Sequence, residues 1–95
     1  MLQNLEVLLM RRNQLSLLPD EFRELRFLQQ LDLSENQFKE FPQVISELSL
    51  LKALDLSGNL LNSLPGNFSL ALSQLRVLNL RSNVFEILPE ELYAS

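Results

Sequence analysis

Apolar residues recur along this chain in a fixed frame that surrounds an asparagine. In one copy of the frame, Leu28, Leu31 and Leu33 precede Asn36, and Phe38 follows it. The same frame surrounds four asparagines in all, namely Asn13, Asn36, Asn59 and Asn83. The steps between them are 23, 23 and 24 residues. A period of this size indicates a stack of structural repeats rather than a fold around one centre.

Each copy of the frame predicts one short strand and one return segment. The step from Leu31 to Leu33 skips one residue, which directs both side chains to the same side of a strand. We therefore predict strands around residues 7–10, 30–33, 53–56 and 77–80, stacked in parallel into one sheet. A Leu-Pro or Phe-Pro step follows, and its proline prevents further ladder pairing. We expect turns, 3₁₀ pieces or one or two helical turns in the return segments 19–27, 42–50 and 65–74.

The third return segment is one residue longer than the second. Seven residues separate Phe68 from Leu75, whereas six separate Ile45 from Leu51. The additional residue lies within 69–73. Because one extra residue in a surface segment is usually tolerated, we expect only a bulged or looser edge at this place.

The four asparagines lie where the chain bends sharply after each strand. An asparagine amide both donates and accepts hydrogen bonds, so it can satisfy backbone groups that such a bend leaves unpaired. We expect the stacked copies to form a ladder along the array. Contact of an exposed asparagine with a partner is the alternative, and the repeat frame favours the structural role for Asn13, Asn36, Asn59 and Asn83.

The phrase L-x-x-L-x-L-x-x-N-x-L, found four times in phase, resembles the leucine-rich repeat family. The resemblance implies an α/β leucine-rich repeat solenoid, with four short parallel strands on the concave side and turns or short helical pieces on the convex side. It implies one domain, residues 1–95, with repeats of about 5–27, 28–50, 51–74 and 75–95. The Leu/Phe-Pro step is similar to that of a short intracellular subtype, which occurs in Ras-pathway signalling scaffolds and in Scribble- and Erbin-like adaptors.

Composition points to the setting of the protein. The chain has no cysteine, no signal-peptide pattern and no long apolar span, which favours a soluble, cytoplasmic protein. The repeat pattern already runs at Leu2, and neither end carries a polar capping element. Solenoids need caps for solubility, so we expect a segment of a longer array, or self-association through the uncapped ends.

The residues between the core leucines of each strand face the concave surface. The middle of this surface is acidic, at Asp32 and Asp55, and its two ends are basic, at Arg11 and Arg81. We predict that a protein or peptide partner binds here, against the candidate residues Arg11, Gln30, Asp32, Asp55, Asn79 and Arg81.

Other function classes are less well supported. Paired carboxylates such as Asp32 and Asp55 can hold a metal or perform acid/base chemistry, but no histidine or cysteine accompanies them and no glycine loop cradles a phosphate. We therefore predict neither an enzyme nor a bound metal or cofactor. The net charge of −4 with dispersed basic residues argues against nucleic acid, and no membrane association is predicted. The second hypothesis is a structural spacer within a larger repeat protein, because the concave face carries no aromatic anchor.

Overall fold

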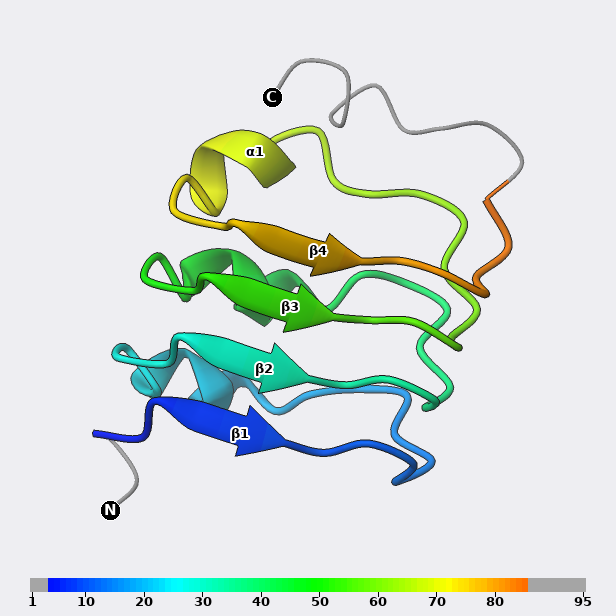
Figure 1. Ribbon diagram of the computed structural model, residues 1–95, viewed down its shortest axis with the longest axis horizontal. Helices are drawn as coiled ribbons and strands as arrows, with labels where there is room; N and C mark the ends of the chain where they lie inside the picture. Colours follow the sequence, from blue (N-terminus) through cyan, green and yellow to red (C-terminus); the bar gives the residue numbers. More distant parts are fainter. Residues whose placement is uncertain (1–3, 86–95) are drawn as a thin grey trace.

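Four short strands and three short helical pieces alternate along residues 4–85 (Figure 1). The computed structural model describes residues 4–85. The elements in chain order are β1 Val7–Leu9, η1 Asp20–Glu24, β2 Gln30–Asp32, η2 Gln43–Glu47, β3 Ala53–Asp55, α1 Phe68–Ala71 and β4 Val77–Asn79. Each strand lies at its predicted place, and η1 and η2 are 3₁₀ helices.

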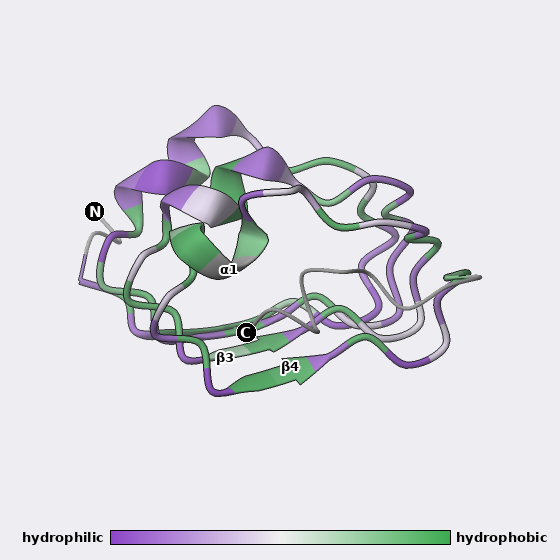
Figure 2. Ribbon diagram, turned by 90° about the horizontal axis from the view of Figure 1, so that it is seen from above, coloured by the Kyte–Doolittle hydropathy of each residue, from purple (hydrophilic) through white to green (hydrophobic). Residues whose placement is uncertain are grey.

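The strands form one parallel sheet in the order β1-β2-β3-β4. Corresponding positions of successive repeats lie in register, so Leu8 pairs with Leu31, Leu31 with Leu54, and Leu54 with Leu78. Figure 2 shows the sheet on one side and the helical pieces on the other. The predicted solenoid with parallel strands is therefore confirmed.

The core consists of the frame leucines and phenylalanines, which pack between one repeat and the next. Because a repeat buries its apolar side chains only against neighbours, burial is most complete in the second and third repeats. The largest fully buried side chains all belong to these repeats, namely Leu28, Leu31, Leu33, Phe38, Ile45, Leu48, Leu51, Leu54, Leu56 and Leu61. In the first repeat, Phe22 is buried, and the other corresponding side chains are only partly buried.

The additional residue of the third return segment changes the type of helix. In η2 the N–H of Leu48 donates to the C=O of Ile45, three residues back. In α1 the N–H of Leu72 donates to the C=O of Phe68, four residues back. A 3₁₀ turn and an α turn differ by one residue, so the insertion is contained within a hydrogen-bonded turn. Where a bulged or looser edge was expected, the structure shows a wider turn, which holds the extra residue between Phe68 and Leu75.

Candidate functional site

The bends after the strands use left-handed backbone geometry immediately before each asparagine. The φ angles are +60° at Arg12, +53° at Glu35, +68° at Gly58 and +58° at Ser82. Glycine adopts this geometry without steric cost. At position 58 the lack of a side chain also avoids a close contact with the neighbouring repeat. A Cβ there would lie 3.0 Å from Cγ of Glu35, so the absence of a side chain leaves room for that glutamate.

Asn36 satisfies the backbone of two repeats from one buried side chain. Its Nδ2 donates to the C=O of Leu33 in its own bend at 2.9 Å, and to the C=O of Met10 in the preceding repeat at 3.0 Å. Its Oδ1 accepts from the N–H groups of Asn13 and Leu15, both at 2.9 Å. The side chain thus joins the first and second repeats through groups that the bend leaves without backbone partners.

The next two asparagines repeat this arrangement one and two repeats further along. Nδ2 of Asn59 donates to the C=O of Leu33 at 3.0 Å, and its Oδ1 accepts from the N–H of Phe38 at 3.0 Å. Nδ2 of Asn83 donates to the C=O of Leu56 at 2.8 Å. Each amide therefore reaches back to the preceding repeat, and the ladder has a direction.

Asn13 differs from the other three because it makes no contact with a preceding repeat within residues 4–85. Its Nδ2 donates only to the C=O of Arg11, at 3.3 Å, and the residue is exposed. In the sequence, Asn13 and Asn83 are equivalent, because they belong to the first and the last copy of the frame. In the structure their bonding differs, because the ladder has a direction and the amide of Asn83 is bonded to the third repeat.

On the concave face, Asp32, Asp55 and Asn79 occupy the same position on three adjacent strands and lie in register. The Oδ1 atom of each accepts a hydrogen bond from the backbone N–H two residues later, at 2.9, 2.9 and 3.0 Å. These Asx-type bonds hold the ends of the strands. The second carboxylate oxygen of each aspartate makes no protein hydrogen bond within the described residues, so it is available to a partner.

The two aspartates therefore have a structural role that the sequence interpretation missed. The local signal was an aspartate at the end of each strand just before the bend, because Asp and Asn side chains commonly accept from the backbone N–H two residues later. Reversal of Asp32 or Asp55 to lysine removes this acceptor at a cost of about 0.5–1.5 kcal/mol per bond. A change to asparagine keeps the acceptor, as Asn79 does, and removes only the charge.

At the bend beside β1, two arginines hold one carboxylate. Nε of Arg11 donates to Oε2 of Glu35 at 2.6 Å, and Nε of Arg12 donates to the same oxygen at 2.9 Å. Arg11, which was predicted to face a partner, thus shares one carboxylate with Arg12 and remains exposed. Arg12 and Glu35 occupy the same position in successive repeats, so the repeat frame already predicts that they are neighbours. Arg81, at the other end, is exposed and forms no ion pair in the described part of the chain.

The arginines lower the pKa of Glu35, chiefly through the hydrogen bond from Arg12 and then that from Arg11. The folded pKa lies below the unfolded value of about 4.3, so the ionised carboxylate favours the folded state. This contribution is present above about pH 4.3 and is lost as the pH falls through the folded pKa. We expect a carboxyl NMR titration to give Glu35 a pKa below the ordinary glutamate value. Replacement of Arg11 and Arg12 by glutamine should return it to that value, and an ordinary pKa in the unaltered chain would contradict the pairing.

The remaining concave residues make the face mixed in character. Gln30 is exposed in the centre, whereas Val7, Leu9 and Val77 expose aliphatic side chains on the two outer strands. The sequence interpretation gave the ends of the face a basic character. The structure shows apolar ends as well, with the acidic pair between them.

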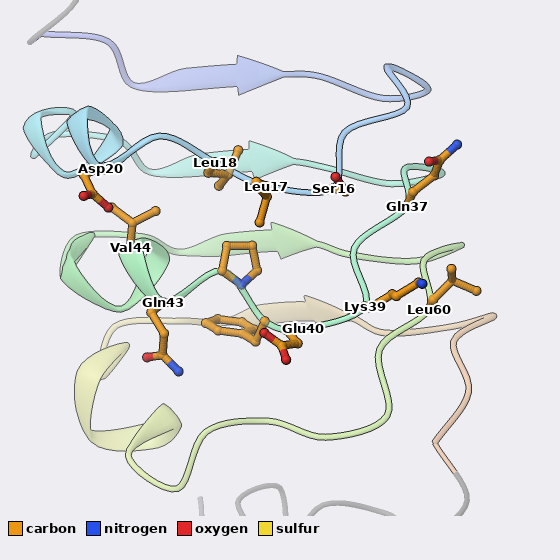
Figure 3. Close-up of a pocket in the computed structure, with 12 residues that line it drawn as sticks. Ser16, Leu17, Leu18, Asp20, Gln37, Lys39, Glu40, Gln43, Val44 and Leu60 are labelled. Carbon is orange, nitrogen blue, oxygen red and sulfur yellow. The ribbon is translucent and has the colours of Figure 1, made fainter.

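A groove of about 750 Å³ lies away from the strands and is lined by residues within 16–20 of the first repeat, residues within 37–44 of the second, and Leu60 of the third (Figure 3). Leu17 and Leu18 line one side, and Phe41, Pro42 and Val44 line the other. Asp20, Lys39 and Glu40 add charges of both signs. None of the residues that line it belongs to a strand, so it is separate from the concave face.

Residues 4–85 contain no group of three or more histidine, cysteine, aspartate or glutamate side chains arranged to hold a metal ion. They also contain no helix long and apolar enough to cross a membrane.

The family profile described as Leucine Rich Repeat matches residues 4–25, 27–48, 50–70 and 74–94, which together make up most of the chain. No match was found among curated proteins.

Solved structures support the same assignment. A leucine-rich repeat protein of Leptospira interrogans has a TM-score of 0.85 and 35% identity, over 94% of this chain and 22% of that one. The leucine-rich repeat domain of APL1B has a TM-score of 0.74 and 26% identity, over 83% of this chain and 25% of that one. Human 5T4, also called trophoblast glycoprotein, has a TM-score of 0.68 and 28% identity, over 88% of this chain and 32% of that one. The chain thus spans a third or less of the length of these neighbours.

Proposed function

Since this chain belongs to the leucine-rich repeat family, whose domains generally mediate protein–protein interactions, we propose that it binds a protein or peptide through the concave face of its sheet. The observation that supports this face most directly is the acidic pair Asp32 and Asp55. Their strands place them side by side in register, and each keeps one carboxylate oxygen free of protein hydrogen bonds within residues 4–85. A pre-ordered sheet binds without the cost of ordering loops.

The chemistry of this face favours a basic, partly apolar partner segment. Two neighbouring carboxylates attract lysine or arginine side chains, and the exposed Val7, Leu9 and Val77 offer aliphatic contacts on either side. Arg81 remains available for an acidic or polar group of the partner. Nucleic acid is a poor candidate, because the net charge is −4 and would repel phosphates.

The test is a selection of binding peptides from a random displayed library on the immobilised 95-residue chain. We expect selected peptides rich in lysine or arginine. The double variant Asp32→Asn with Asp55→Asn should bind them about tenfold more weakly at low salt, mainly through slower association, and the difference should shrink as salt is added. Because asparagine retains the Asx acceptor, the fold should be preserved.

A matched control comes from the convex side. Glu24 and Glu47 occupy equivalent positions of η1 and η2 and are both exposed. Their double change to glutamine alters the net charge by the same amount and should leave peptide binding unchanged. If both double variants bind the selected peptides as the unaltered chain does, the acidic pair is not the binding site.

The spacer role is the second candidate, and the length comparison favours it. The chain spans 22% to 32% of the neighbours, so a binding site of a longer protein could lie in other repeats. Failure to select any peptide would support this role. We further propose a cytoplasmic setting, in line with the lack of cysteine, and no catalytic role, since the leucine-rich repeat fold is typically a non-enzymatic interaction module.

A further inference from the structure

The groove beside the return segments exposes an aliphatic side chain at a position that faces outward in each repeat. Leu17 lies at its edge and is 81% exposed. Glu40 and Ser63, which occupy the same frame position in the second and third repeats, are also exposed. Since the second repeat has a neighbour on each side, stacking does not cover this position. The exposure of Leu17 therefore follows from the frame.

The floor of the groove is apolar and is fixed by the core. Phe41 and Val44 are buried, with 6% and 7% exposure. The ring of Phe41 packs edge-on against that of Phe68, with centroids 5.5 Å apart. Pro42 restricts the backbone between the two floor residues. A ligand thus meets a preformed apolar surface, and an aliphatic side chain placed beside Leu17 would leave water there.

The two chain segments that form the walls carry backbone groups without partners. The N–H and C=O groups of residues 16–18 on one wall, and of 39–41 on the other, make no backbone–backbone hydrogen bond within residues 4–85. Such groups favour a ligand that offers both donors and acceptors. An extended peptide backbone does this, whereas a purely apolar ligand does not.

The charged side chains of the groove are also without partners. Asp20, Lys39 and Glu40 form no ion pair in the described part of the chain. Asp20 begins η1 at one end of the groove, Lys39 lies beside Leu60 at the other, and Glu40 lies between them (Figure 3). A negative and a positive end favour a ligand whose own ends carry the opposite charges.

We propose that this groove binds an extended peptide segment in which an aliphatic residue lies between a basic residue and an acidic one. The aliphatic side chain packs against Leu17 and Phe41. The basic side chain lies beside Asp20 and Glu40, and the acidic one beside Lys39. No residue that lines the groove belongs to a strand, so this is a second binding surface that does not depend on the concave face.

An NMR titration of the isotope-labelled 95-residue chain with the end-blocked pentapeptide Lys-Val-Leu-Val-Glu tests this site. We expect saturable shift changes at the amides of Leu17 and Glu40 and none at those of Asp32 and Asp55. A peptide with serine in place of the central leucine should bind about tenfold more weakly, because it lacks the aliphatic anchor. Lysine in place of the peptide's glutamate should weaken binding about threefold.

Protein variants test the same anchor from the other side. Leu17→Ser gives the first repeat the residue found at Ser63, so the fold should be preserved, and it should weaken pentapeptide binding about tenfold. The matched control is Leu70→Ser, because Leu70 is 84% exposed and does not line the groove. This control should bind as the unaltered chain does. The double change of Asp32 and Asp55 to asparagine should also leave binding unchanged, which separates the groove from the concave site.

Five outcomes would overturn the proposal. Four concern the peptide, namely no saturable shift changes, shift changes on the concave strands instead, equal binding of the serine peptide, and unchanged affinity of Leu17→Ser. The fifth is a concentration-dependent shift of the groove amides without peptide, because a second copy of the chain would then be the occupant.

Discussion

An Asn36→Ala variant is expected to lose about 3 kcal/mol of unfolding free energy. This is the upper end of the range of about 1–3 kcal/mol for leaving buried polar groups without hydrogen-bond partners. The amide is buried and bonds the C=O groups of Leu33 and Met10 and the N–H groups of Asn13 and Leu15. Its removal leaves groups of two repeats unpaired in a bend that cannot rearrange. Urea or guanidinium unfolding of the two chains measures the difference.

The direction of the ladder supplies the control for this result. Asn13→Ala removes only one long hydrogen bond at an exposed position, so we expect a loss below about 0.5 kcal/mol. Asn83→Ala should fall between the two, because its amide bonds the third repeat but is only partly buried. Equal losses at Asn13 and Asn36 would contradict the ladder that the hydrogen bonds describe.

The second large effect is expected at Phe38. Its side chain is fully buried between the second repeat and its neighbours, with 0% exposure. Phe38→Ala should cost about 3–5 kcal/mol, because the removed ring leaves a cavity that a stack of short strands cannot close. Thermal and denaturant unfolding should both show the loss, and the shift should appear as a lower midpoint at an unchanged denaturant slope.

The chain provides a natural comparison for Phe38. Leu15 and Leu61 occupy the same position in the first and third repeats, so Phe38→Leu places the frame residue there. We expect a much smaller loss, about 1–2 kcal/mol, from partial repacking. If alanine and leucine at position 38 cost the same, the ring does not fill the space between the repeats.

The repeat frame predicted most of the fold, for a physical reason that can be seen at single residues. Leu31 and Leu33 point to one side because strand geometry alternates side chains, and this depends only on residues close in the chain. The 23-residue step then places Leu8, Leu31 and Leu54 in register, as the structure shows. Local geometry and a constant period together are sufficient to derive a parallel solenoid.

The contacts of the candidate site residues could not be predicted in the same way, because they depend on which side chains meet across the repeats. Asp32 and Asp55 were predicted to make the middle of the concave face acidic, and the structure adds that each also holds the end of its strand through one oxygen. The sequence placed Arg11 on this face, and the structure adds its bond to Glu35, which lies 24 residues further along the chain. The frame shows which positions are neighbours, and only the packed side chains show which of them form bonds.

The sequence by itself thus determined the repeat length, the strands, their parallel order and the residues of the core. Tertiary structure decided the direction of the asparagine ladder, the change from 3₁₀ to α turn at α1 and the pairing of Arg11 and Arg12 with Glu35. The physical reason is that periodicity specifies positions, which stacking makes equivalent. Hydrogen bonds and ion pairs join particular atoms across those positions, and their direction and partners arise only when one repeat lies against the next.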